Sequence, residues 1–214
     1  MSNKVSLPRY TLGEELVNSI SHGVGAGLAI AGMVLCLVKA STSAATVAAA
    51  LYGTLMICLY LISCLYHALS PRVKGKKVLR VIDHANVFLM VAGTYMPICL
   101  SLINGALGWT IFGVVWAITI VAVVFSCINV DRYQMVGVVC NLLLGWGVLL
   151  IYGVLIKLTS PEAMRLLIVG GLAYTVGSAL YVIGGKIKWM HSFFHFMVLL
   201  GSILHFFFIY LYCL

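Results

Sequence analysis

Charged residues are scarce in this chain of 214 residues, where only 8% are Asp, Glu, Lys or Arg and 63% are hydrophobic. A soluble fold of this length needs a largely charged surface, and the mean hydropathy of +1.13 is far too high for one. The acidic residues are too few to help; they are Glu14, Glu15, Asp83, Asp131 and Glu162. The composition excludes a soluble globular protein and predicts an integral membrane protein.

Several other features are absent. No loop is long enough for a separate domain, and the chain has neither a repeat of fixed period nor a low-complexity stretch. The seven cysteines form no CxxC pair and have no regular spacing, so we expect buried free thiols. The net charge is +8, but the basic residues lie in short gaps between apolar runs, without interleaved aromatic residues along one face. This pattern does not favour a nucleic-acid partner.

Seven apolar runs fill most of the chain, and each is long enough to cross a bilayer as a helix, which takes about 20 residues. We therefore predict an all-α bundle of seven transmembrane helices in a single domain, with residues 1–14 as a short cytoplasmic segment. The first run follows Lys4 and Arg9 as in a signal peptide, but it is too long for one and should remain as an anchor. The runs are residues 16–38, 44–69, 81–103, 109–128, 135–156, 166–183 and 192–214.

The distribution of Lys and Arg predicts the orientation. If the N-terminus is cytoplasmic, ten of the 13 basic residues lie on the inner side, and Lys39, Lys157 and Arg165 lie outside. The positive-inside bias then places the N-terminus in the cytoplasm and the C-terminus outside. The basic segment 71–80 acts as a topology determinant and can contact anionic lipid, so membrane lipids are the expected partners.

Four titratable residues lie at the cytoplasmic ends of the predicted helices: His67, Asp83, His191 and His195. His191 and His195 are four residues apart, so on a helix they share a face and can bind one metal ion. His67 can supply a third nitrogen from a neighbouring helix. Three histidines leave a fourth tetrahedral position open, as in catalytic zinc sites.

Two further residues belong to this candidate site. Asp83 is the one carboxylate that the pattern places near an embedded position at this depth, where it can orient a water molecule or take its proton. Ser63 lies one turn before His67 on the same face, so its hydroxyl can polarise a carbonyl or orient the water.

A second polar stripe on the first helix is formed by Glu15, Asn18 and His22. Two interpretations stay open: an accessory polar face of the site, or a stripe that caps the first helical turn. His84 and His205 are more simply explained as histidines that lie at the headgroup level or hydrogen-bond a neighbouring backbone group.

The motifs together resemble the hemolysin III family, which belongs with the progestin and adipoQ receptors. They are Glu15-x-x-Asn18-x-x-x-His22, Ser63-x-x-x-His67, Asp83-His84, the run from Ala92 to Pro97, and His191-x-x-x-His195. The resemblance implies a seven-helix protein of the bacterial cell (inner) membrane. It also implies that His67, His191 and His195 bind Zn²⁺, with Asp83 and Ser63 beside the metal.

Similar sites in alkaline ceramidases suggest a hydrolase of a lipid amide or ester, acting on a lipid-like substrate with a role in membrane homeostasis. One alternative is a cytolysin or pore-former, which needs a polar stripe across the bilayer, whereas Thr94, Asn141 and His205 look isolated in the sequence. The other alternative is a receptor or sensor with structural zinc, which a closed fourth coordination position would favour. The substrate and the oligomeric state stay open.

Overall fold

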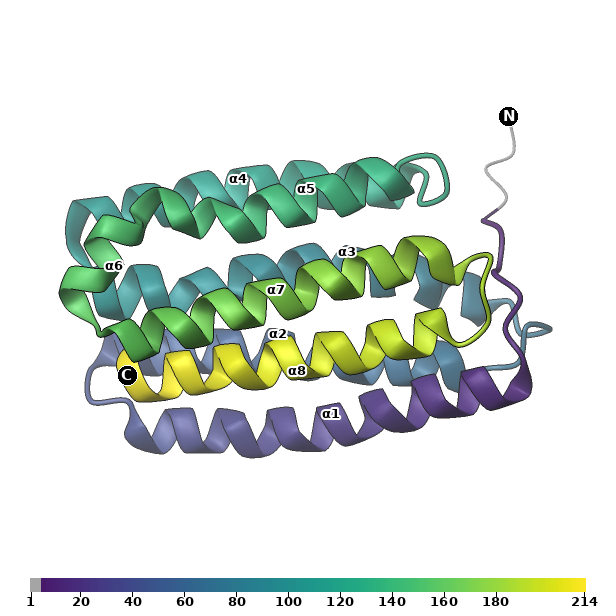
Figure 1. The fold of residues 1–214 in the computed structure, drawn as a ribbon, viewed down its shortest axis with the longest axis horizontal. Coiled ribbons are helices and arrows are strands. Elements are labelled where there is room, and N and C mark those ends of the chain that lie inside the picture. The colour runs from purple at the N-terminus through teal and green to yellow at the C-terminus, as the bar shows by residue number, and fades with distance from the viewer. Residues whose placement is uncertain (1–4) are drawn as a thin grey trace.

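A computed structural model describes residues 5–214 and is built from helices with short connections (Figure 1). Lys4, which the orientation argument counts on the inner side, lies outside the described residues. Within this described range, seven helical spans are long and apolar enough to cross a membrane, which confirms the predicted all-α bundle of seven spans. They are α1 (Leu12–Lys39), α2 (Ser43–Ala68), α3 (Gly75–Pro97) with the π-helix η1 (Ile98–Ile103), α4 (Gly105–Ile128), a fifth span made of α5 (Gln134–Trp146), the 3₁₀ segment η2 (Gly147–Ile151) and α6 (Tyr152–Leu158), α7 (Pro161–Gly184) and α8 (Met190–Tyr212).

Each span begins one to six residues before its predicted apolar run. α1 begins at Leu12, inside the segment assigned to residues 1–14, because Thr11 and Glu14 form a capping box that satisfies the free backbone N–H groups. α3 begins at Gly75, six residues before its apolar run, and its first turns carry basic residues. Lys77 is exposed and can extend to polar surroundings, whereas Lys76 and Arg80 are buried and form ion pairs.

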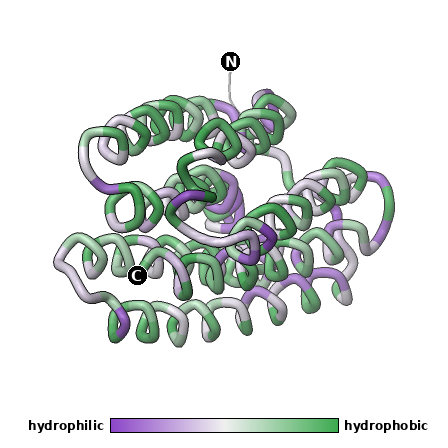
Figure 2. Tube along the Cα trace, turned by 60° about the vertical axis from the view of Figure 1, so that its left-hand side comes forward, coloured by the Kyte–Doolittle hydropathy of each residue, from purple (hydrophilic) through white to green (hydrophobic). Residues whose placement is uncertain are grey.

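Helices α1, α2, α3 and α8 surround much of the buried core, and α7 pairs with α8 (Figure 1). α4 and α5 form an outer layer that packs more loosely on α3 and α7. Figure 2 shows hydrophobic residues along the helices, with hydrophilic stretches mainly at helix ends and connections. The exposed sides of the helices are therefore suited to lipid.

All seven cysteines are free, as expected. Their predicted burial holds for only three of them, Cys36, Cys99 and Cys213, whereas Cys127 is exposed on α4. A thiol is tolerated at an exposed position because this surface is apolar.

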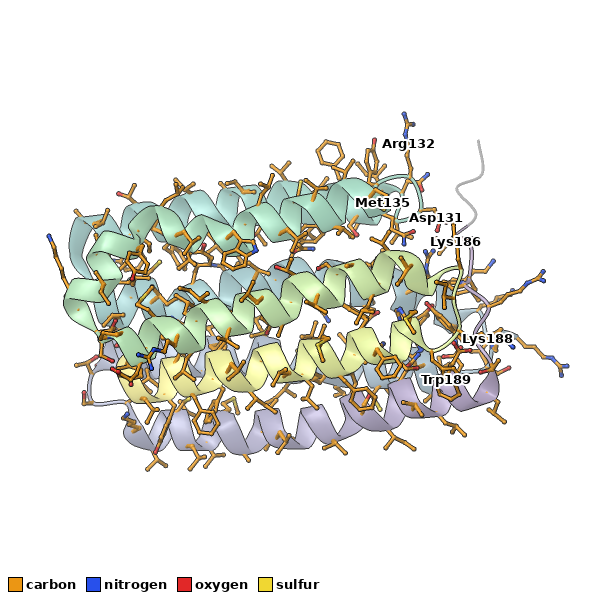
Figure 3. All side chains as sticks on the ribbon, viewed as in Figure 1. Asp131, Arg132, Met135, Lys186, Lys188 and Trp189 are labelled. Atoms are coloured by element: carbon orange, nitrogen blue, oxygen red, sulfur yellow. The ribbon has the colours of Figure 1, made fainter. Side chains whose placement is uncertain are left out.

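The start of α1 and the C-terminus lie at opposite ends of the bundle, as an odd number of spans requires (Figure 1). Arg132, Lys186 and Lys188 lie at the end of the bundle where α1 begins (Figure 3). The fold therefore gathers at one end these basic residues, which the sequence predicts on the inner side.

We expect a reporter fused after Leu214 to be active only when it works on the outer side of the membrane, because the positive-inside bias keeps the basic end in the cytoplasm. A fusion in the α2–α3 connection, after Val73, serves as the matched cytoplasmic control. Measured activities with the opposite pattern would overturn the predicted orientation.

Candidate metal centre and adjoining cavities

Three histidines from two helices meet at the end of the bundle where α1 begins. His67 lies in the last turn of α2, and His191 and His195 lie in the first turns of α8. One ligand atom from each lies within 4.8 Å of the others, and all three side chains are buried. The Nε2 atoms of His191 and His195 are 3.2 Å apart. The structure thus brings together the three residues that the sequence proposed as metal ligands.

Glu15 makes the shortest polar contact with this cluster. Its Oε2 lies 2.6 Å from Nδ1 of His67, and its Oε1 accepts a hydrogen bond of 2.5 Å from Nζ of Lys76. The Lys76 side chain is 1% exposed and also donates to the Leu69 carbonyl oxygen at 2.8 Å. Two sequence interpretations are therefore wrong. Asp83 is not the one carboxylate at this depth, and Glu15 does not cap α1, because the capping box uses Thr11 and Glu14.

The other two residues of the α1 stripe also face the histidines. Nδ2 of Asn18 lies 3.5 Å from Nδ1 of His67, and the His22 ring centre lies 3.9 Å from that of His195. Within residues 5–214, both ring nitrogens of His22 are buried without a hydrogen-bond partner. Glu15, Asn18 and His22 thus form a polar face beside the cluster, as one of the two sequence interpretations held.

Asp83 and Ser63 lie close together, since the Ser63 side chain hydrogen-bonds the Asp83 carboxylate. Asp83 lines the same cavity as His191, and both Asp83 and Ser63 line a second cavity together with His22. The carboxylate is thus exposed to cavities that border the histidine cluster.

The larger cavity has a volume of about 580 Å³ and lies among α3, α4, α5, α7 and α8. The smaller one has a volume of about 150 Å³. The cavities share wall residues near the centre of the site, namely Asp83, Val87, Asn141, Ser178 and Phe194. Because most of the larger wall is apolar, this cavity suits a hydrocarbon chain better than a soluble metabolite.

Three polar residues that look isolated in the sequence lie together in the structure. Thr94, Asn141 and His205 come from α3, α5 and α8, and all line the smaller cavity. The sequence could not show this, because each is a single polar residue in an apolar helix. Nε2 of His205 donates to the Leu167 carbonyl oxygen at 3.0 Å, so the expected backbone partner is confirmed.

His84 is likewise accounted for without a metal. Its Nδ1 donates to the Arg80 carbonyl oxygen at 2.8 Å, and its Nε2 accepts from the Tyr181 hydroxyl at 2.8 Å. Both ring nitrogens are therefore occupied, as expected for a histidine with a packing role.

The segment before α1, residues 5–11, makes contacts with the end of the bundle that the sequence did not predict. Oδ1 of Asp131 accepts from the Arg80 guanidinium at 2.6 Å, and the Asp131 carboxylate also accepts from the backbone N–H and hydroxyl of Ser6. Partial burial favours a raised pKa for Asp131, but these hydrogen bonds outweigh it and hold that pKa below its usual range. The segment is thereby attached to α3 and the α4–α5 connection.

Tyr10, in the same segment, stacks on His191 with ring centres 4.7 Å apart and also lines the larger cavity. Burial raises the pKa of the Tyr10 phenol, so it stays neutral. Tyr10 was not predicted as a site residue, because no periodic pattern marks a residue that lies outside the helices.

The connection before α8 positions His191. Trp189, labelled in Figure 3, has a left-handed backbone with φ of 68°, and its N–H donates to Oε1 of Glu14 at 2.7 Å. A non-glycine residue in this region is strained and needs surrounding contacts to hold it. The hydrogen bond to Glu14 holds this conformation at Trp189, which lies two residues before His191.

The histidine cluster fits a metal ion. Nε2 of His67 is buried without a hydrogen-bond partner among the described residues, although buried polar atoms are normally paired. Ligand nitrogens of a tetrahedral zinc ion lie about 3.3 Å apart, given Zn–N distances of about 2.0–2.1 Å. The 3.2 Å separation between His191 and His195 matches that spacing. Three neutral imidazoles are also a donor set that zinc prefers.

The fold and this cluster define a multi-pass membrane protein with seven helices and a histidine site at one end of the bundle. The model of a family described as haemolysin-III related matches residues 10–206, and the chain belongs to this family. It is 33% identical over 218 residues to "Hemolysin-3" of Bacillus cereus, covering 100% of this chain and 98% of that protein. It is also 33% identical over 207 residues to "Hemolysin-3 homolog" of Bacillus subtilis (strain 168), covering 95% and 96% of the two chains.

Proposed function

We propose that this protein is a zinc-dependent hydrolase that cleaves an amide or ester bond of a lipid-like substrate within the bacterial inner membrane and so helps to set membrane composition. One observation carries the proposal. His191, from the histidine cluster, and Asp83, a carboxylate, lie on the wall of the same apolar cavity of about 580 Å³. This volume lies within the range of about 300–1,000 Å³ that is typical of small-molecule pockets.

His67, His191 and His195 would hold the ion, and His67 would bind it through Nε2. Bound zinc polarises a carbonyl oxygen and lowers the pKa of water to about 7. Three protein ligands leave room for a reactant, which distinguishes catalytic zinc from closed structural sites.

The chain's own groups supply the remaining functions. The Asp83 carboxylate accepts a proton from the attacking water, and the Ser63 hydroxyl donates to that carboxylate and orients it. The apolar walls around Val87 and Phe194 hold the acyl chain and exclude bulk water from the bond that is cleaved.

A sensor with structural zinc is the second candidate, and the position of His22 favours it. This histidine packs against His195 and has two unpartnered ring nitrogens within the described part of the chain. If His22 closed the fourth coordination position, the site would hold zinc without turnover.

Metal analysis of the purified protein, combined with a fatty-acid release assay, tests the proposal. The assay panel contains N-acyl sphingoid amides, monoacylglycerols and lysophospholipids in mixed micelles, with chelator-treated protein as the control. We expect stoichiometric zinc and release from at least one lipid class, lost on chelation and restored by Zn²⁺. Stoichiometric zinc without release from any class would support the sensor instead, and protein without zinc would contradict both.

A further inference from the structure

We propose that Glu15 is a positioning residue for the metal centre, which holds His67 in the tautomer and orientation that direct its Nε2 at His191 and His195. The inference rests on the metal part of the proposed function and does not require hydrolysis. It starts from the contact of 2.6 Å between Oε2 of Glu15 and Nδ1 of His67.

The contacts of Glu15 define its protonation and that of His67. An ammonium group lies 2.5 Å from Oε1, and the same Lys76 Nζ is held by the Leu69 carbonyl oxygen, so Glu15 is an ionised carboxylate. An ionised carboxylate can only accept hydrogen bonds, and therefore Nδ1 of His67 carries the hydrogen. In the neutral imidazole that binds metals, Nε2 of His67 then keeps its lone pair, as a metal ligand requires.

The unpartnered state of Nε2 agrees with this assignment. It is buried and has no hydrogen-bond partner in residues 5–214, whereas Nδ1 is engaged by Glu15. The Asn18 amide nitrogen lies 3.5 Å from the same Nδ1 and cannot donate to an atom that already carries a hydrogen. Nε2 is therefore the nitrogen of His67 that remains available to an ion shared with the other two histidines.

Lys76 gives the arrangement its stability. A buried carboxylate without a partner is costly, and so is a buried ammonium group, but here each compensates the other. The pair also joins the first turns of α1 and α3 at the end of α2, where His67 lies.

A carboxylate that accepts from the second ring nitrogen of a metal-binding histidine makes the imidazole more basic, and losing it typically lowers metal affinity about 10- to 100-fold.

The test is the zinc affinity of Glu15→Gln, measured by competition with a chelator of known affinity. Gln keeps the size of the side chain but loses the charge, so we expect about 10- to 100-fold weaker binding. Glu162→Gln is the matched control, because it makes the same change in the first turn of α7 with a fully exposed side chain. Its zinc affinity should equal that of the wild type.

A second variant guards against a folding defect from an unpaired lysine. Glu15→Gln combined with Lys76→Met removes both buried charges and should bind zinc as weakly as Glu15→Gln alone. Lys77→Met is the control for the Lys76 substitution, because Lys77 is the neighbouring lysine and is exposed. Wild-type zinc affinity in either the single or the double Glu15 variant would overturn the inference.

Melting temperatures separate positioning from a simple tie between helices. If Glu15 positions His67, zinc should raise the melting temperature of Glu15→Gln less than that of the wild type. If Glu15 only joins helices, metal-free and zinc-loaded protein would be destabilised equally, and the inference would be wrong. Failure of the wild type itself to bind zinc would instead contradict the proposed metal centre.

Discussion

Combined replacement of His191 and His195 by alanine is expected to abolish stoichiometric zinc binding. The two residues supply two of the three nitrogens that converge within 4.8 Å, and a site reduced to His67 holds the ion poorly. Zinc content after purification and the affinity in chelator competition measure the effect. Zinc retained at wild-type stoichiometry in the double variant would rule out the centre.

Single replacements localise the effect. His67→Ala should also cause a severe loss of zinc, although it leaves the Glu15–Lys76 ion pair in place. The loss would therefore report a missing ligand and not a broken contact between α1 and α3. His205→Ala is the control, because that ring is bonded to the Leu167 carbonyl oxygen and lies outside the cluster. It should retain full zinc binding.

Asp83→Asn is expected to keep zinc and the fold but lose hydrolysis by roughly a hundredfold or more, the usual scale for a positioned base. Asparagine has the size of aspartate and can still interact with Ser63, but its amide cannot accept a proton at neutral pH. The measurement is the rate of fatty-acid release at saturating substrate, with zinc content determined on the same sample. Unchanged turnover would exclude Asp83 as the base.

The same variant reports whether Asp83 is close enough to the metal to be stabilised by it. A carboxylate near hydrocarbon is costly, and a nearby cation offsets part of that cost. Chelation should therefore lower the melting temperature of the wild type more than that of Asp83→Asn in the same detergent. Equal chelator effects would mean that Asp83 does not sense the metal, and its catalytic assignment should then be dropped.

The comparison between sequence and structure is instructive at the helix that carries Glu15. Its spacing with Asn18 and His22 predicts one shared face, and the structure places that face against the histidine cluster. The partner Lys76 was not predicted, because a basic residue in the segment 71–80 looks like any other topology determinant. Only the tertiary structure, in which Lys76 reaches Glu15 beyond the end of α2, shows that this lysine is buried while Lys77 is exposed.

The sequence by itself determined the membrane class, the seven spans and the depth of the histidines. These properties are local: the length of an apolar run must match the bilayer, and residues four apart share a helical face. The tertiary structure decided which helices adjoin, how each is rotated, and hence the Glu15–Lys76 pair, the Tyr10 stack and the cavity shared by Thr94, Asn141 and His205. Lipid-facing and core-facing positions are both apolar in a membrane bundle, so hydrophobic pattern carries little information about rotation or neighbours.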